Sequence, residues 1–459
     1  MALNIVIMAA GKGTRMKSAT PKVLHKLAGR SLLGHVLKSC DDLAADARLI
    51  ITGHGAEAVE TAVAADGISF VRQMPQLGTG HAIQQVVPAL IGDGTTLILN
   101  GDVPLIETST AKALIEACAG HALVLLTVDL ADPTGYGRIV RDKDDGGVLA
   151  IVEHKDATPE QRLIREGYSG MMAAPTGALK RWVGQLNNNN AQGEYYLTDI
   201  VAMAVAEGLP VLGIKAHSEI EVLGVNDPVQ LSQLERAFQA RQAEHFMRAG
   251  VRLADPSRFD LRGTLTHGQD CEIDVNCVFE GTVALGDNVR IGANCVVRNV
   301  TIASGARIHE FTHIDGEKQG ASVGEGALIG PFARLRPGAQ LGNEVHIGNF
   351  VEVKNSTLAH GAKANHLAYL GDATVGKRVN YGAGSITANY DGANKHRTTI
   401  GNDVHVGSNC VLVAPVTLGA GATIGGGSTI TKDVNAGDLA VARGKQVALT
   451  GWTRPAKKR

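Results

Sequence analysis

The chain has 459 residues, enough for two or three domains, and its formal net charge of −1 gives no electrostatic basis for binding nucleic acid or an acidic membrane. The six cysteines form no C-x-x-C pair and no zinc-site spacing, so we expect reduced thiols that pack as small hydrophobic groups. Residues 1–10 lack the basic segment of a signal peptide and are too short an apolar run to span a membrane, which predicts a cytoplasmic protein.

The first residues predict a phosphate-binding turn. A buried parallel strand is expected over 4–10, followed by the turn Gly11-Lys12-Gly13, with Arg15 and Lys22 close behind. A glycine-rich turn after the first strand is where α/β sheets bind phosphates, through backbone N–H groups and nearby cations. The turn lacks the P-loop pattern and the third glycine of the dinucleotide fingerprint, and a lone G-x-G also fits an ordinary turn. The two cations favour a triphosphate site.

Strand and helix patterns then alternate to about residue 226, which predicts a doubly wound α/β domain. The expected elements are strands over 47–52, 68–71 and 96–99, a helix over 56–64, and a helix capped by Thr79. Asp102 follows the strand at 96–99, at the edge where such sheets bind ligands, and a carboxylate there suits Mg²⁺. A capping aspartate in a turn would fit the same position.

A linker helix is expected over 227–250. Asp227 and Pro228 form an N-cap and N1 pair, and Gly250 is the expected stop. The helix would join a domain at 1–226 to a second domain at 251–459. A helix that belongs wholly to the first domain would show a similar pattern.

In the second half a small aliphatic residue returns at every sixth position. The repeating residues are Leu285, Ile291, Val297, Ile302, Ile308, Ile314, Val323, Ile329, Leu335, Leu341, Ile347, Val353, Ile400, Val406, Leu412, Leu418, Ile424 and Ile430. A period of six fits neither an amphipathic helix nor an alternating strand, but it is the signature of a parallel β-helix whose coils have three six-residue faces. A break after Val353 contains residues 387–394, which we expect to leave the β-helix as a loop.

Two cations of the repeat predict a second phosphate site. Arg336 and Lys354 each follow an inward aliphatic residue and lie 18 positions apart, so they should stack one coil apart on the same outer edge. Like charges at ~5 Å repel unless an anion lies between them. Isolated surface cations are the alternative. His366 follows closely; such a histidine is often structural, but a neutral imidazole beside a sugar phosphate is suited to deprotonate an amine.

These residues carry a family resemblance. The turn with Pro21-Lys22 resembles the nucleotide loop of sugar-1-phosphate nucleotidyltransferases. Further matching motifs follow in order: Gln73, Gly78-Thr79, Gly101-Asp102, Tyr136-Gly137-Arg138, Glu153-His154-Lys155, Glu194-Tyr195-Tyr196-Leu197-Thr198-Asp199 and Gly224-Val225-Asn226. With the hexapeptide half attached, nearly the whole chain resembles the bacterial bifunctional UDP-N-acetylglucosamine pyrophosphorylases and glucosamine-1-phosphate acetyltransferases. The resemblance also implies that the β-helix is left-handed.

The resemblance implies two reactions that together make UDP-N-acetylglucosamine for peptidoglycan and lipopolysaccharide. The second half would transfer acetyl from acetyl-CoA to glucosamine 1-phosphate. The first half would then transfer uridylyl from UTP to N-acetylglucosamine 1-phosphate and release pyrophosphate, with Mg²⁺ held by Asp102 and Asn226. Arg15 and Lys22 would neutralise the triphosphate.

The remaining site residues are also implied by the resemblance. For UTP and the UDP-sugar they are Met8, Ala9, Ala10, Gly11, Lys22, Gln73, Gly78, Thr79, Asn100, Gly101, Asp102, Gly137, Glu153, Tyr168, Tyr196, Thr198 and Asn226. Relatives usually carry Asn where this chain has Tyr168, and often Tyr where it has Asn100.

In the second half, His366 would be the general base. The residues implied to bind glucosamine 1-phosphate are Arg336, Lys354, Tyr369 and Asn380. Those implied to bind acetyl-CoA are Ala383, Asn389, Tyr390, Ser408, Gly426 (often Ala in relatives) and Arg443. The family's β-helices form trimers with this site between subunits, so a homotrimer is expected. The basic tail at 454–459 would either contact CoA phosphates or be solvated.

Two other functions are compatible with parts of this pattern. The chain could be a single-function nucleotidyltransferase whose β-helix only oligomerises or senses metabolites, but Arg336, Lys354 and His366 argue against this. The whole chain could be a non-catalytic regulatory or scaffold subunit, but four retained residues argue against this: Arg15, Lys22, Asp102 and Asn226.

Overall fold

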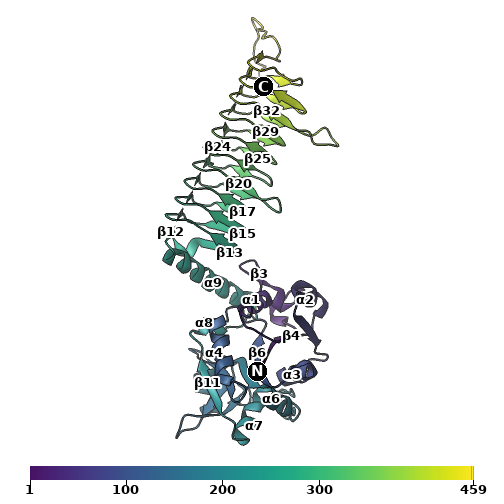
Figure 1. Cartoon of the computed structure of the whole chain (residues 1–459), viewed down its shortest axis with the longest axis vertical. Coiled ribbons are helices and arrows are strands. Elements are labelled where there is room, and N and C mark those ends of the chain that lie inside the picture. The colour runs from purple at the N-terminus through teal and green to yellow at the C-terminus, as the bar shows by residue number, and fades with distance from the viewer. Residues whose placement is uncertain (456, 458–459) are drawn as a thin grey trace. The chain divides into compact units, whose positions relative to one another are not determined.

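The structure is a computed structural model that describes residues 1–455 and 457 (Figure 1). The chain divides into two compact units, Met1–Phe238 and Gln239–Arg459. The helix α9 (Pro228–Arg248) begins in the first unit and ends in the second. The expectation for the basic tail falls partly on residues 456, 458 and 459, which lie outside the described residues.

The first unit is built on a mixed sheet in the order β11-β7-β10-β6-β1-β4-β5, with β8 paired to β10 and β9 paired to β8. Its strands are β1 (Ala2–Ala9), β4 (Ala47–Thr52), β5 (Ile68–Arg72), β6 (Gly94–Asn100), β7 (Leu123–Asp129), β8 (Arg138–Arg141), β9 (Val148–Val152), β10 (Glu166–Pro175) and β11 (Val211–Lys215). A small hairpin pairs β2 (Lys26–Leu27) with β3 (Arg30–Ser31). β1 is parallel to β4 and β6, whereas β10 runs antiparallel to β6 and β7.

Helices cover both faces of this sheet, as a doubly wound α/β fold requires. They are α1 (Leu32–Ser39), α2 (Ala56–Val63), α3 (Thr79–Val86), α4 (Thr108–Cys118), α5 (Pro159–Arg162), α6 (Thr176–Val183), α7 (Ile200–Ala206) and α8 (Glu219–Val222). Ile5 and Ile7 of β1 pack with α1, α2 and α4, and Val6 packs with α3, α6 and α7. Successive side chains of a strand point to opposite faces, so a strand buried on both sides is a continuous apolar run. The predicted fold of the first half is confirmed.

The helix boundaries confirm one predicted cap and correct another. The Asp227 side chain accepts a hydrogen bond of 2.9 Å from the backbone N–H of Gln230, which is the geometry of an N-cap. Thr79 is not an N-cap: the cap of α3 is Gly78, at φ 108°, and it makes no side-chain bond. The Thr79 hydroxyl instead accepts from the backbone N–H of Leu197 at 3.2 Å, so it ties α3 to the next motif of the site.

The second unit is a parallel β-helix, which confirms the fold predicted from the six-residue period (Figure 1). One face consists of β12 (Arg252–Leu253), β14 (Glu272–Ile273), β16 (Arg290–Ile291), β18 (Arg307–Ile308), β21 (Leu328–Ile329), β24 (His346–Asn349), β27 (Lys363–His366), β30 (Asn380–Tyr381), β33 (His405–Val406), β36 (Thr423–Ile424) and β38 (Leu439–Ala440).

The other two faces share the long first strands β13 (Phe259–Thr266), β15 (Cys277–Leu285) and β17 (Val296–Ile302). One continues as β20 (Ala321–Val323), β23 (Gln340–Leu341), β26 (Thr357–Leu358), β29 (Ala373–Val375), β32 (Thr398–Ile400) and β35 (Val416–Leu418). The other continues as β19 (His313–Asp315), β22 (Arg334–Leu335), β25 (Glu352–Lys354), β28 (Tyr369–Gly371), β31 (Ile386–Ala388), β34 (Val411–Val413) and β37 (Thr429–Ile430).

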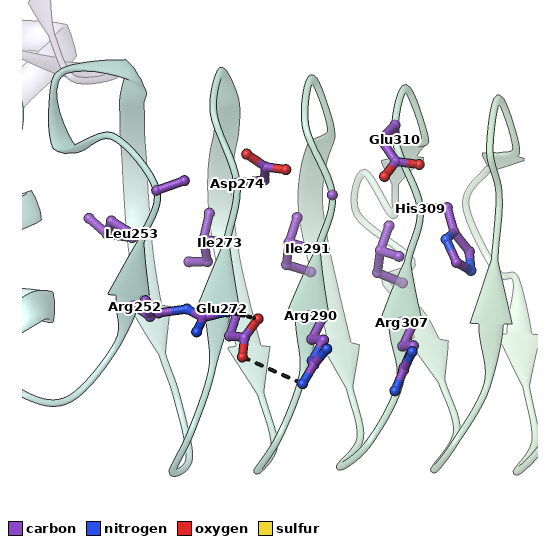
Figure 2. Close-up of a pocket in the computed structure, with 13 residues that line it drawn as sticks. Arg252, Leu253, Glu272, Ile273, Asp274, Arg290, Ile291, Arg307, His309 and Glu310 are labelled. Atoms are coloured by element: carbon purple, nitrogen blue, oxygen red, sulfur yellow. Dashed lines mark ion pairs between the residues drawn. The ribbon is translucent and has the colours of Figure 1, made fainter.

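The repeating aliphatic residues named above are all buried and form the core of the β-helix. Figure 2 shows the arrangement on the first coils, where Leu253, Ile273 and Ile291 form one row and charged residues at the preceding positions form another. The core continues through the apparent break after Val353, with buried Leu358, Ala364, Leu370, Val375 and Tyr381 at the inward positions. The sequence pattern is lost there because some steps have five residues and one inward residue is aromatic. The loop predicted at 387–394 lies slightly later in the chain: residues 387 and 388 belong to β31, and residues 389–397, between β31 and β32, leave the coil.

Candidate active sites

A cavity of about 330 Å³ lies at the carboxyl ends of β1 and β6. A 3₁₀ helix at Thr14–Met16 begins where the glycine-rich turn ends, and a second one follows at Lys22–Leu24. The residues that line the cavity are Met8, Ala9, Ala10, Gly11, Lys22, Val23, Gln73, Gln76, Gly78, Thr79, Ala82, Asn100, Asp102 and Glu194. Most of the residues predicted to bind UTP therefore line one cavity.

The predicted metal ligands converge on a cation. The Lys22 ammonium contacts the Asp102 carboxylate and donates to the Asn226 side-chain oxygen at 3.3 Å, and Arg15 donates to the same oxygen at 2.8 Å. Carboxylate and amide oxygens are hard ligands that suit Mg²⁺, which usually takes one or two protein ligands and completes its shell with phosphate oxygens and water. The two side chains fit such an ion because they already hold the Lys22 cation between them.

A second, smaller cavity of about 210 Å³ shares Met8, Thr79 and Asn100 with the first. Its other lining residues are Gly135, Tyr136, Gly137, Glu153, Tyr168, Ser169, Gly170, Leu197 and Thr198. The residues predicted to bind the sugar therefore adjoin those predicted to bind the nucleotide. A site with two connected cavities can hold two substrates side by side.

The smaller cavity contains a buried carboxyl group. Burial raises the pKa of Glu153 above its ordinary value, and the Thr198 hydroxyl donates to it at 3.2 Å. Tyr168, at the position where relatives usually carry Asn, is buried in the core with a hydroxyl that has no partner. Burial raises the pKa of Tyr168 well above its ordinary value, so this phenol is neutral. Tyr168 therefore adds an aromatic ring to the wall of this cavity, where relatives usually carry an amide.

Four predicted ligands of the nucleotide half line neither cavity: Arg15, Gly101, Tyr196 and Asn226. Gly101 donates its backbone N–H to Met8 at 2.9 Å, which joins β6 to β1 beneath the site. The Tyr196 hydroxyl accepts from Gln192 at 2.8 Å. The Asn226 side-chain oxygen accepts from Arg15 and Lys22, as described above.

The predicted stack of Arg336 and Lys354 is present on the β-helix. Their inward neighbours Leu335 and Val353 are paired in register, so the two cations lie one coil apart. Along the same outward column the charges of earlier coils alternate in sign, through Arg262, Glu280, Arg298 and Asp315. The alternation ends at Arg336 and Lys354, where two cations are adjacent.

A third cation joins this pair. Lys395, in the loop at 389–397, lies beside Lys354 and lowers the pKa of the Lys354 ammonium below its ordinary value. Arg336 donates to Glu352 at 2.9 Å, which raises the pKa of Arg336. The cluster lines a cavity of about 790 Å³ together with Arg298, Asn299, Glu317, Lys318, Gln319, Pro337, Asn355 and Asp372. The three cations outnumber the two carboxylates that pair with them, Glu352 and Asp372, and this excess of positive charge favours a bound anion.

The predicted base His366 lies at the end of β27, where the chain turns to the next face. Its Nδ1 is 2.9 Å from the side-chain oxygen of Asn349, one coil earlier. An Nδ1–H that donates to this amide oxygen leaves Nε2 free to accept a proton. Tyr369 follows on β28, paired with Glu352 beside Arg336. Asn380, by contrast, lies on β30, on a different face of the β-helix from Lys354.

The residues predicted to bind acetyl-CoA fall into two groups. Ala383, Ser408 and Gly426 stack on successive coils, and Arg443 donates to the Gly426 carbonyl at 2.8 Å. Asn389 and Tyr390 lie in the loop at 389–397, and the Tyr390 side chain is exposed. One chain therefore does not bring all the predicted ligands of the acetyl site together.

A row of exposed apolar side chains runs next to His366. Phe311, Phe332, Phe350 and Leu367 occupy the same corner of successive coils, are 46–62% exposed, and all have a left-handed backbone with φ of 50–58°. The phenyl rings stack with centroids 4.9 and 5.4 Å apart. A non-glycine residue in this conformation costs about 1–2 kcal/mol, and Asn occupies the corner in earlier coils.

Sequence reasoning did not identify Lys395, Asn349, Asp372 or Glu352. Glu352 and Asp372 are the carboxylates nearest the cation stack. Asn349 lies 17 positions before His366, close to one coil, and this spacing could have found it. Lys395 lies in the loop, where the period gives no register.

A further hollow of about 450 Å³ lies over the first coils, lined by several charged side chains (Figure 2). There Glu272 is ion-paired with both Arg252 and Arg290, the latter at 3.5 Å. None of the predicted site residues lies in it.

The fold and the sites define a nucleotidyltransferase domain joined to a hexapeptide-repeat transferase domain. Residues 5–166 match the MobA-like NTP transferase domain family, and residues 265–299, 320–355 and 397–432 match the bacterial transferase hexapeptide family. The chain is 72% identical to "Bifunctional protein GlmU" of Methylibium petroleiphilum, with 100% of both chains covered. It is 66% identical to the protein of the same name from Paracidovorax citrulli, with 99% of both covered. The chain belongs to the family of bifunctional GlmU proteins.

The chain is therefore a bifunctional enzyme with acetyltransferase and uridylyltransferase activities that make UDP-N-acetylglucosamine. Among residues 1–455 and 457, no helix combines the length and apolar content needed to cross a bilayer.

Proposed function

We propose that the Arg336–Lys354–Lys395 cluster binds the phosphate of glucosamine 1-phosphate and that His366 is the base of the acetyl transfer. The observation that supports this best is the cluster itself, because Arg336 and Lys354 are adjacent at the end of a column of alternating charges and Lys395 adds a third cation beside Lys354. Nε2 of His366 takes a proton from the substrate ammonium. The free amine then attacks the thioester carbonyl, the carbon–sulfur bond breaks, and the remaining extra proton of the nitrogen passes to the leaving thiolate, which gives the amide and free CoA thiol.

We further propose that the product then reacts in the paired cavities of the first unit. Arg15 and Lys22 would hold the triphosphate, and the small cavity with Glu153 and Thr198 would hold the N-acetylglucosamine ring. The phosphate oxygen of the sugar phosphate attacks the α-phosphorus of UTP, and the bond to the pyrophosphate oxygen breaks. Asp102 and Asn226 would hold Mg²⁺, which supplies charge neutralisation when bound. Positioning and charge are the main requirements of such a transfer.

The experiment that tests the assignment follows free thiol and pyrophosphate separately in one reaction with glucosamine 1-phosphate, acetyl-CoA, UTP and Mg²⁺. His366→Ala should abolish thiol release and leave pyrophosphate release from supplied N-acetylglucosamine 1-phosphate unchanged. Asp102→Ala should have the opposite effect. Normal thiol release by the His366 variant would rule out the base assignment, and normal pyrophosphate release by the Asp102 variant would rule out the metal role.

We also propose that the chain acts as a homotrimer through its β-helix. Two features support this: the exposed row of Phe311, Phe332, Phe350 and Leu367, and the position of Asn380 on a different face from the other sugar-phosphate ligands. A second copy that covers the row would bury it and could supply Asn380. Phe332→Ser should therefore lower the trimer fraction in sedimentation velocity and reduce acetyl transfer, while uridylyl transfer remains.

The domain bounds 1–226, 227–250 and 251–459 are part of the same proposal, with α9 as the linker. We propose a cytoplasmic location, which is supported by six free, buried thiols suited to a reducing compartment.

A further inference from the structure

Asp372 carries a buried carboxylate beneath the cation cluster of the β-helix. It follows β28 and is 7% exposed. Its Oδ1 accepts from the Asn355 side chain at 2.5 Å, its Oδ2 accepts from the Asn389 side chain, and the Lys354 ammonium is 4.0 Å away. A buried carboxylate is stable only when it is paired and hydrogen-bonded, and these three contacts supply both conditions.

The same residue holds both ends of the loop at 389–397. Asn389 begins the loop and is held by the Asp372 side chain, and Thr398 follows the loop and donates its backbone N–H to the Asp372 carbonyl at 3.1 Å. Asn389 is itself buried, at 8% exposure. The loop carries Tyr390, predicted to contact acetyl-CoA, and Lys395, the third cation of the cluster. Asp372 therefore connects the base of the loop to the coil that carries Lys354.

We infer that Asp372 is a positioning residue that holds the acyl-donor loop and the sugar-phosphate cations in one arrangement. It does not touch either substrate in this assignment. The Asp372 carboxylate attracts the Lys354 ammonium and accepts a hydrogen bond from Asn389 of the loop. The proposed sugar-phosphate site and the proposed acetyl-CoA site therefore depend on the same carboxylate. The inference rests on the proposed roles of Lys354 and the loop.

The test is Asp372→Asn in the full chain, which keeps the size of the side chain and removes its charge. The new amide can accept from only one of the two asparagines, because its –NH₂ group would face the other donor. We expect KM for glucosamine 1-phosphate and KM for acetyl-CoA each to rise about tenfold, the loss expected for a charged hydrogen bond, with a smaller change in kcat. Uridylyl transfer should be unchanged.

A merely structural role would lower the melting temperature and the amount of active protein but leave both KM values unchanged in the folded fraction. Asp403→Asn is the matched control, because Asp403 makes an exposed ion pair with Arg378 at 2.7 Å elsewhere on the β-helix. It should leave both KM values at the wild-type level.

A second variant keeps the test decisive if Asp372→Asn does not fold. Asn355→Ala removes one partner of Asp372 and leaves every predicted substrate ligand in place, so both KM values should rise about threefold. Unchanged KM values in every folded variant would overturn the inference. Failure of the wild-type chain to release thiol would instead overturn the proposed assignment of the acetyl site.

Discussion

Lys22 and Asp102 are ion-paired at the nucleotide cavity, so the cation predicted to bind the triphosphate contacts the carboxylate predicted to bind the metal. The side chains are 15% and 20% exposed, and Asn226 contacts the same ammonium. A metal ion and the ammonium cannot share these oxygens without repulsion. If these residues have the proposed roles, we expect Lys22 to move towards the phosphates when the metal binds with UTP.

Lys22→Ala should accordingly strengthen metal binding to the nucleotide-free enzyme while it weakens UTP binding. We expect the Kd for Mn²⁺, measured by electron paramagnetic resonance titration, to fall about tenfold because a charge-assisted contact with Asp102 is lost. Lys26→Ala, at an exposed lysine of the neighbouring hairpin, is the control and should leave it unchanged. An equal or weaker Mn²⁺ affinity in the Lys22 variant would show that the ammonium does not compete with the metal.

The contact between Asn349 and His366 should set the pH dependence of acetyl transfer. Asn349→Asp places a carboxylate 2.9 Å from the imidazole in the arrangement described. A carboxylate stabilises the imidazolium, so the acid limb of the rate–pH profile should move upward by about one pH unit. Asn349→Leu, without an acceptor, should lower kcat without that shift. Identical rate–pH profiles for the wild type and the Asp variant would show that Asn349 does not affect the pH dependence of acetyl transfer.

The Lys354–Lys395 contact predicts weaker substrate binding at alkaline pH. The Lys395 ammonium lowers the pKa of Lys354, so Lys354 loses its charge at a lower pH than an ordinary lysine. The KM for glucosamine 1-phosphate should therefore begin to rise at a lower pH in the wild type than in Lys395→Gln. The Lys395 variant should have a higher KM at neutral pH, because one cation is gone.

The lowered pKa of Lys354 also predicts how the stability of the fold changes with pH. Because the folded pKa of Lys354 is below the unfolded value, the protonated lysine destabilises the fold at neutral pH. This cost disappears as the pH rises through the lowered pKa towards the ordinary value. Thermal melts of the wild type and of Lys395→Gln should converge at high pH, and a constant difference would contradict the interpretation.

Tyr168 gives a prediction for the sugar cavity. Its hydroxyl is buried without a partner, which costs about 1–3 kcal/mol. Tyr168→Phe should therefore raise the free energy of unfolding by about 1 kcal/mol in denaturant titrations and leave the KM for N-acetylglucosamine 1-phosphate unchanged. A raised KM in this variant would mean that the hydroxyl contacts the sugar after all. Tyr168→Asn should destabilise the first unit, because it leaves a cavity in the core.

The fold was largely predictable because its signals are local. Ile291 and the other repeating aliphatic residues recur with the period of the coil, and the apolar run of β1 indicates a strand buried on both faces. The stack of Arg336 and Lys354 followed from the same period, since a fixed repeat converts sequence spacing into spatial distance. The sequence pattern was lost after Val353, where step lengths changed, although the coil itself continues.

The sequence by itself determined the two architectures, the glycine-rich turn and the stacked cations, because each depends on residues close in sequence or one period apart. Only the tertiary structure decided that Lys22 pairs with Asp102, that Lys395 joins Lys354, and that Asp372 holds the loop. These contacts connect segments through turns and a loop whose lengths follow no period. Their geometry is set by how the whole chain packs, which no local pattern encodes.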